Sequence, residues 1–385
     1  MKKLFIKTLF ASISVKLIRA HSLKLASISV KRFAFIGPHS RPLALTVLVT
    51  FISVFAVAQQ RPHYTQYILN NYILNPALSG IENYTDVKLS ARDQWIGLNG
   101  APQTFYFTIQ GPIGKKDYRT NATSFDVPGE NPRGKAYWES YTAAEPHHGI
   151  GMQVINDRTG SFNRFSADVT YAYHIGLNAT TNLAGGFSAG ITKIGLDRSK
   201  TDFSGTGDPN DPAAGAAYDG YINKIKPDLG VGLWLYSRNY FAGFSAQQVI
   251  PQKFTFEDDA LVSNPGKLIP HLFLTGGYRF LLNDDINATP SLMIKYIQGS
   301  SKNNFQFETN IKLQYRSLLW IGGSYRYQDG YAAMLGINVS NTFNIGYAYD
   351  FTTTNLNTVS RGTHEIVLGF LLGNKYSDAC PRCNW

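Results

Sequence analysis

Three stretches of this chain have residue types that could bind a metal ion. His147 and His148 are adjacent imidazoles, and residues 207–211 and 257–259 supply hard oxygen ligands of the kind that Ca²⁺ prefers. Adjacent histidines on a strand would point to opposite faces, and no third ligand lies near them in the sequence. Neither acidic stretch has the spacing of an EF-hand loop. We therefore favour loops over metal sites at all three places.

Sulfur, phosphate and nucleophile chemistry have weaker support. Cys380 and Cys383 form a single C-x-x-C, which cannot supply four zinc ligands and lacks a surrounding βαβ pattern. An exposed disulfide or two free thiols are favoured there. Residues 111–116 lack the G-x-x-x-x-G-K-[ST] spacing and are interpreted as a strand-end turn. Neither G-x-S-x-G nor H-E-x-x-H occurs. We expect no catalytic, cofactor-binding or metal-binding residues, although distant strands could still assemble a hydrolase.

The net charge of +10 is concentrated at the N-terminus. Residues 1–58 hold nine Lys or Arg and no acidic residue, and taking these nine from 36 leaves 27 basic against 26 acidic residues. A nucleic-acid-binding surface is therefore not expected. The apolar run 43–57 ends in Ala56-Val57-Ala58, which is typical of a signal peptide cleaved before Gln59. The long basic region before this run is either an extended n-region or the result of a start codon assigned too early. The alternative to a cleaved signal peptide is an uncleaved membrane anchor.

The rest of the chain alternates with a period of two. Phe305, Phe307 and Ile311 are apolar, whereas Glu308 and Lys312 belong to the other set. Most such segments have nine or more residues, which suits tilted strands crossing a bilayer better than ordinary globular strands. The sequence therefore predicts an all-β, transmembrane, antiparallel up-and-down β-barrel of about fourteen strands. The strands centre near residues 85–92, 103–110, 148–157, 163–176, 181–195, 227–237, 240–249, 271–282, 286–298, 304–315, 317–328, 331–340, 343–351 and 363–372.

The connections also fit a barrel. Counted along the chain, the even gaps are tight turns at 178–180, 237–239, 283–285, 316–317 and 341–342, and the odd gaps include long polar stretches. This pattern predicts short periplasmic turns, long external loops, both termini periplasmic, and pairing of the last strand with the first. The long even gap at 111–147 is the exception. It is an insertion, a lumen plug, a periplasmic contact or a missed pair of strands.

Charged side chains on the water-facing phase form a further candidate site. We expect charge pairing that fills a polar interior, and a conducting or ligand-binding pore is the alternative. The residues are Asp168, His174, Lys295, Glu308, Lys312 and Arg326.

Motifs at both ends of the barrel region complete the pattern. Residues 64–80 contain Q-Y-x-x-N-x-x-x-x-N-P-A-x-x-G, with Tyr64, Tyr67, Ile68 and Tyr72 placed to share one face of a short helix. R-x-Q-W-x-G-x-x-G-A-P-x-T follows the first strand, and H-E-I-x-L-x-F marks the last. With these motifs and Cys380-Pro381-Arg382, the sequence resembles the PorP/SprF family of type IX secretion system membrane proteins. The matching residues are Tyr67, Asn70, Asn75, Pro76, Ala77, Gly80, Arg92, Gln94, Trp95, Gly97, Gly100, Pro102, His364 and Glu365.

The resemblance implies an integral outer-membrane barrel that assists export or surface attachment of large adhesin-like cargo, in some members for gliding motility. Its partners would be that cargo, type IX secretion components and outer-membrane lipid. The segment 111–147 and the ending Cys383-Asn384-Trp385 depart from the family pattern. We divide the chain into a signal peptide (1–58), a short periplasmic motif segment (59–84), the barrel (85–372) and a tail (373–385). A passive channel or hydrophobic-solute transporter, and a barrel enzyme acting on lipid, remain alternative functions.

Overall fold

The structure is a computed structural model in which residues 64–115, 143–197, 221–254, 266–297, 305–316, 318–340 and 342–374 are described. The expected signal peptide, the acidic stretches 207–211 and 257–259, and Cys380 and Cys383 lie outside these residues. None of the helices in the described ranges is long and apolar enough to span a membrane.

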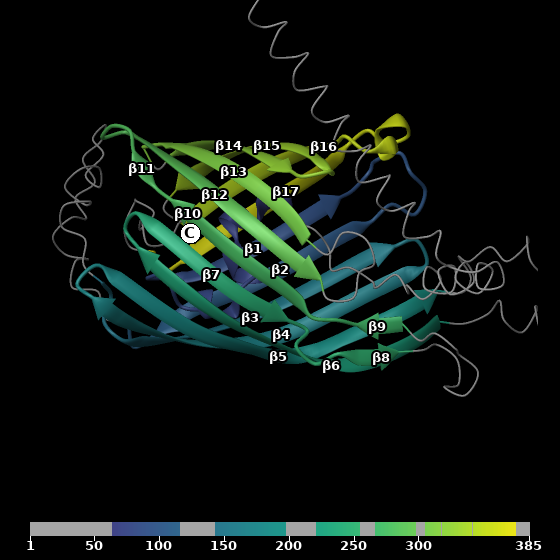
Figure 1. The fold of residues 1–385 in the computed structure, drawn as a ribbon, viewed down its shortest axis with the longest axis horizontal. Coiled ribbons are helices and arrows are strands. Elements are labelled where there is room, and N and C mark those ends of the chain that lie inside the picture. The colour runs from purple at the N-terminus through teal and green to yellow at the C-terminus, as the bar shows by residue number, and fades with distance from the viewer. Residues whose placement is uncertain are drawn as a thin grey trace, which may run out of the picture. The chain divides into compact units, whose positions relative to one another are not determined.

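Fourteen antiparallel strands of the described chain form one closed ring (Figure 1), which confirms the predicted fold class. Each strand pairs with its neighbours in sequence, and β1 pairs with β17. The short strand β11 (Phe280–Leu281) continues β10 along β12, and β8 (Gln252–Phe254) and β9 (Gly266–Leu268) form a separate hairpin. The ring consists of β1 (Thr85–Asp93), β2 (Gln103–Ile113), β3 (His147–Thr159), β4 (Phe162–Asn178), β5 (Thr181–Asp197), β6 (Tyr221–Ser237), β7 (Tyr240–Gln247), β10 (His271–Tyr278), β12 (Ile286–Ile297), β13 (Phe305–Tyr315), β14 (Leu319–Arg326), β15 (Gly330–Ser340), β16 (Phe343–Thr352) and β17 (Thr363–Leu372).

Alternation along the strands separates a lipid-facing surface from a packed interior. Val169 is 60% exposed, whereas its neighbours Asp168 and Thr170 are buried. The six charged residues predicted for the inner phase, from Asp168 to Arg326, are all buried, whereas Phe305 and Phe307 are exposed. An apolar outer band with polar side chains inside is the pattern that a bilayer requires of a barrel.

The two ends of the barrel differ in their connections. The five predicted tight turns join β4 to β5, β6 to β7, β11 to β12, β13 to β14 and β15 to β16, and we call this end the short-turn end. Long connections follow β5, β7 and β16 at the opposite, long-loop end. Strand β2 pairs directly with β3. The ring of described strands is therefore continuous from β2 to β3.

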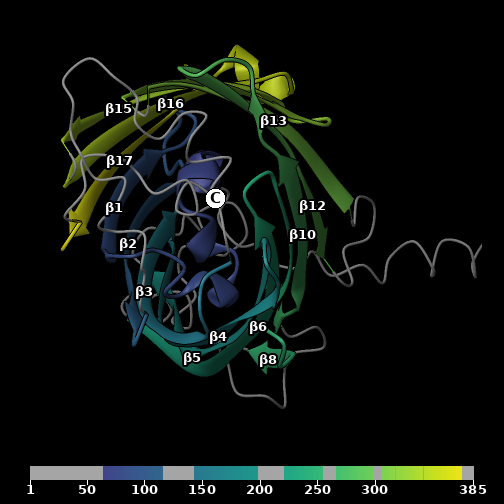
Figure 2. The same cartoon turned by 90° about the vertical axis from the view of Figure 1, so that its left-hand side faces the viewer.

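The N-terminal motif lies inside the ring of strands (Figure 2). It forms three 3-10 helices, η1 (Thr65–Leu69), η2 (Asn71–Ile73) and η3 (Pro76–Leu78), and a fourth, η6 (Asn355–Thr358), lies between β16 and β17. The segment was expected to form one short helix on the periplasmic side. Instead it is broken at Asn70 and Asn75 and runs through the lumen, where burial on all sides replaces a single apolar face.

Candidate functional site

Residues 64–81, here called the plug, fill the interior of the barrel. Tyr64, Tyr67, Ile68, Ile73 and Leu74 form one buried cluster with side chains from eight strands. Those wall residues are Tyr106, Ile155, Phe273, Met293, Trp320, Met334, Ala348 and Val367. The hydrophobic core of this protein is therefore built between the plug and the wall.

Asn75 fixes the middle of the plug to the wall. Its Oδ1 accepts from the Ala77 amide at 3.0 Å, and this bond caps η3. Its Nδ2 donates to the carbonyls of Leu233 on β6 and Phe244 on β7, at 3.0 and 3.2 Å. Pro76 restricts Asn75 to extended backbone and suits the first position of η3. The Asn-Pro pair thus starts a helical turn and anchors it at the same point.

Glycines of the wall make room for the plug. A Cβ at Gly232 would lie 1.9 Å from the Asn75 Oδ1, and one at Gly186 would lie 2.7 Å from the Ala77 Cα. Gly80 has φ +77°, and its own Cβ would lie 2.5 Å from the Cα of Gly149. The plug can therefore approach the wall this closely only where the wall residue lacks a side chain, and at Gly80 and Gly149 both residues lack one.

Two histidines hold the plug near the short-turn end. The rings of His147 and His174 stack with centroids 4.5 Å apart. Nε2 of His174 lies 2.7 Å from the Ser79 carbonyl, and Nε2 of His147 lies 3.1 Å from the Gly80 carbonyl. The expectation of a loop at His147 and His148 is wrong, because both belong to β3, where they point to opposite faces. Within the described ranges, no group of three or more His, Cys, Asp or Glu could hold a metal ion.

Three further polar residues of the plug bond to the wall. Tyr67 accepts from Asn310 on β13, Asn70 donates to Thr108 on β2 at 3.1 Å, and Tyr72 bonds to Thr170 on β4 at 2.7 Å. Burial raises the pKa of the Tyr67 and Tyr72 hydroxyls above their usual range. Both phenols therefore stay protonated.

At the long-loop end, Arg92, Asp350 and Glu365 of the wall bind Thr65, the first residue of η1. We call these four residues the latch. Arg92 on β1 donates to Glu365 on β17 and to Asp350 on β16, each at 2.7 Å. Thr65 donates its amide to Glu365 at 2.9 Å and its hydroxyl to Asp350 at 2.5 Å. The three charged side chains are buried, so the charges are paired and hydrogen-bonded within the lumen.

The R-x-Q-W-x-G-x-x-G-A-P motif continues from the latch into a loop at the barrel mouth. Gln94, with its amide oxygen facing Arg92, accepts from Nε at 2.8 Å, and its backbone amide donates to the Pro102 carbonyl at 2.9 Å. Trp95 has φ +50°, and its amide donates to the Thr363 hydroxyl at 3.1 Å. Gly97 and Gly100 also have positive φ, of +103° and +71°. The motif therefore specifies turns that dock this loop beside β17.

Two predicted residues from one motif lie on opposite sides of the wall. Glu365 joins the latch, whereas His364 faces outward and bonds to the Tyr347 hydroxyl at 2.7 Å. Of the predicted inner charges, Glu308 and Arg326 pair at 3.1 Å. This pair supports the expectation of charge pairing in the interior.

Several residues of the site were absent from the sequence expectations. They are Thr65, Ser79, Asp350 and the wall glycines Gly149, Gly186 and Gly232. The wall glycines could have been found from the sequence. Glycine inside a strand weakens it, so glycine at an inward-facing position indicates that another backbone approaches there. Nothing in the spacing of Thr65 and Asp350 indicates that they meet, since 285 residues separate them.

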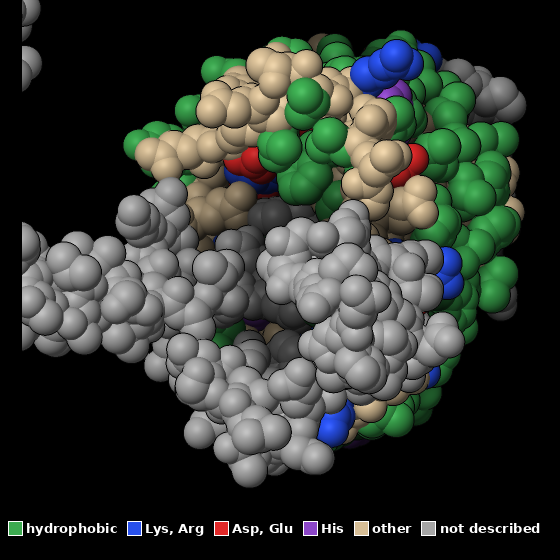
Figure 3. Space-filling model, turned by 90° about the vertical axis from the view of Figure 1, so that its right-hand side faces the viewer, with side chains coloured by type: hydrophobic (Ala, Val, Ile, Leu, Met, Phe, Trp, Pro, Cys, Tyr) green, Lys and Arg blue, Asp and Glu red, His purple; other side chains and the backbone are tan. Residues whose placement is uncertain are grey.

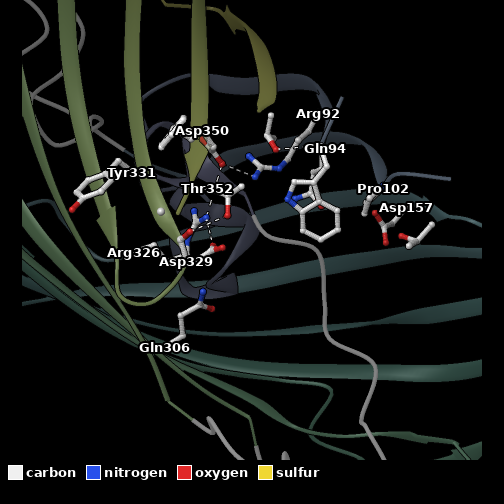
Figure 4. A pocket seen from close by; sticks show the side chains of 15 residues that line it. Arg92, Gln94, Pro102, Asp157, Gln306, Arg326, Asp329, Tyr331, Asp350 and Thr352 are labelled. Carbon is white, nitrogen blue, oxygen red and sulfur yellow. Dashed lines mark hydrogen bonds and ion pairs between the residues drawn. The ribbon is translucent and has the colours of Figure 1, made fainter. Parts of the chain in front are cut away.

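A cavity of about 340 Å³ opens at the mouth beside the latch. Arg92, Trp95, Asp157, Arg326, Asp329 and Asp350 are among its lining residues. Figure 4 shows Arg92 and Asp350 facing each other, with Asp157 and Tyr331 at opposite sides of the view. In Figure 3, which faces the long-loop end, acidic and basic side chains lie together inside a rim of other side chains.

A family model described as type IX secretion system membrane protein PorP/SprF matches residues 56–370. Among solved structures, the chain is similar in fold to the toluene transporter TbuX of Ralstonia pickettii, at TM-score 0.45 and 11% identity over 78% of this chain and 92% of that chain. It is also similar to the toluene transporter TodX of Pseudomonas putida, at TM-score 0.44 and 10% identity over 82% and 94%. No curated protein matches the chain.

Proposed function

We propose, because the chain belongs to the PorP/SprF family of type IX secretion system membrane proteins, that it is a non-enzymatic outer-membrane barrel. In this proposal it assists secretion or surface anchoring of a large adhesin-like partner, in some settings for gliding. The long loops and the mouth contact the cargo, and the short-turn end faces the periplasmic secretion components.

One observation carries the proposal. The motifs by which the sequence resembles the family build the plug, the latch and the mouth loop. Asn75 and Gly80 fit the plug to the wall, and Arg92 and Glu365 hold Thr65. Residues that stabilise a filled lumen suit a rigid platform for other proteins better than a path for solutes.

A passive channel or hydrophobic-solute transporter is the second candidate. The polar inner face and the mouth cavity favour it. A solute path through the ring would require the plug to move, because plug side chains pack against strands on all sides of the lumen. That requirement separates the two candidates experimentally.

The test is deletion of the gene, followed by surface proteomics and uptake assays. Under the proposal, one large exported protein disappears from the cell surface while small-solute uptake remains normal. Complementation with the wild-type gene restores it. An unchanged surface proteome, or a selective loss of solute uptake, contradicts the proposal.

A further inference from the structure

The mouth cavity has an excess of negative charge. The charged residues described at the cavity or directly beneath it comprise three guanidinium groups and five carboxylates. They are Arg92, Arg164, Arg326, Asp157, Asp329, Asp350, Glu308 and Glu365. Arg92 and Arg326 form ion pairs with carboxylates of this same set, and the carboxylates outnumber the guanidinium groups five to three. A cavity with this balance attracts a cationic group.

Two buried atoms of the cavity lining lack hydrogen bonds. Asp350 is only 8% exposed, and its Oδ1 has no partner among the described residues. Arg326 is 6% exposed, and its Nη2 also lacks a partner there. Buried polar atoms are normally paired, because leaving one unpaired costs about 1–3 kcal/mol. Asp350 and Arg326, whose Oδ2 and Nη1 lie 3.9 Å apart, thus each keep one unpaired polar atom at the cavity lining.

The shape of the cavity adds an apolar contact. Trp95 lines the cavity, and its backbone is held at φ +50°, a conformation that residues other than glycine rarely adopt. Hydrogen bonds from Ile96 to the Gly362 carbonyl at 3.0 Å and from Arg361 to the Ile96 carbonyl at 2.8 Å hold the loop in place. An indole fixed beside carboxylates suits the alkyl stem of a basic side chain.

We infer that the mouth cavity is a recognition site for a basic residue, Lys or Arg, of an exported polypeptide. The cationic head bonds to Asp350 and lies near Asp329, the stem packs on Trp95, and a backbone carbonyl of the peptide accepts from Arg326. The inference rests on the proposed function, because that function assigns the mouth of the barrel to contact with the cargo.

The test uses the full mature protein in lipid nanodiscs and three defined peptides. They are acetyl-Gly-Lys-Gly-amide, the same peptide with norleucine, and the same peptide with glutamate, and binding is measured by saturation-transfer NMR titration. Norleucine keeps the alkyl stem and removes the charge. We expect the lysine peptide to bind roughly fivefold or more tightly than the norleucine peptide, as one charge-assisted bond provides.

Two variants and one matched control locate the binding. Asp329→Asn lies at the half-exposed rim and should weaken lysine-peptide binding about threefold to fivefold, as expected for one partly solvated ion pair. Asp285→Asn makes the same change at the short-turn end and should leave binding unchanged. Trp95→Ala should weaken the lysine and norleucine peptides alike. Heat-modifiable migration on gels verifies folding of each variant.

Equal binding of the lysine and norleucine peptides, preference for glutamate, or no binding by any peptide overturns the inference. The proposed function fails separately, because its readout is surface display. If Asp329→Asn and Trp95→Ala restore display in the deletion strain and no peptide binds, the barrel serves secretion without this site.

Discussion

Arg92 and Glu365 lie directly opposite each other where the first strand of the barrel meets the last, and they form a hydrogen-bonded ion pair at 2.7 Å. The same Glu365 oxygen accepts from the Thr65 amide at 2.9 Å. The contact that closes the ring is therefore also the contact that holds the plug. Closure of the barrel and filling of its lumen are coupled through one carboxylate.

Replacing Arg92 by methionine should destabilise the barrel strongly. The change removes the cation and leaves Asp350 and Glu365 buried without it, and breaking a buried pair in this way costs on the order of 3–5 kcal/mol. The urea midpoint for unfolding in lipid vesicles should fall accordingly. Arg316→Met is the matched control, because Arg316 pairs with Asp285 in an exposed turn and its loss should change the midpoint little. Similar midpoints for the two variants would show that the latch contributes no stability.

Gly80→Ala should displace the plug, whereas Gly114→Ala should not. Both glycines have left-handed backbone, at φ +77° and +70°, so alanine costs about 1 kcal/mol at either position. Only at Gly80 would the new Cβ also meet backbone, 2.5 Å from the Cα of Gly149, and nothing lies within 4 Å at Gly114. Planar-bilayer recordings should show low conductance for the wild type and Gly114→Ala, and raised conductance for Gly80→Ala. Open channels in the wild type would contradict a filled lumen.

Asn75→Ala should lower stability by about 2 kcal/mol, because it removes a helix cap and two hydrogen bonds to the wall. Asn75→Asp separates these roles. Aspartate keeps the acceptor that caps η3 and sets a carboxylate against the carbonyls of Leu233 and Phe244. We expect Asn75→Asp to unfold at a lower urea concentration than Asn75→Ala. A midpoint for Asn75→Asp equal to that of the wild type would mean that Asn75 does not anchor the plug.

The wall of this barrel was predictable from the sequence and its contents were not. A period of two over nine or more residues depends only on having lipid on one side and polar contacts on the other, so β4 and β13 appear directly in the pattern. The closing pair of β1 and β17 follows from the even number of strands. The register of that pair, which sets Arg92 opposite Glu365, does not follow from the strand number, because the stagger of the strands also determines it.

The plug escaped prediction for physical reasons. Its three short 3-10 turns bury side chains on every face, so no helical period marks them. Trp320 and Tyr236 resemble interfacial aromatic residues in sequence, yet both are buried inside. Which side of the wall such a residue faces depends on what fills the lumen, and that depends on contacts such as Thr65 with Asp350 across 285 residues.

Cross-linking of Ser79 to Thr170 in cells tests the central claim, that the N-terminal motif segment occupies the lumen. Their hydroxyl oxygens lie 2.7 Å apart, a geometry that suits a disulfide after Ser79→Cys and Thr170→Cys. Both native cysteines are replaced by serine, and cross-linked peptides are identified by mass spectrometry of isolated outer membranes. The control pairs Ser79→Cys with Val169→Cys, the outward-facing neighbour. We predict a disulfide in the first protein and none in the control. Free thiols at both positions of a folded Ser79→Cys/Thr170→Cys protein would contradict the filled lumen.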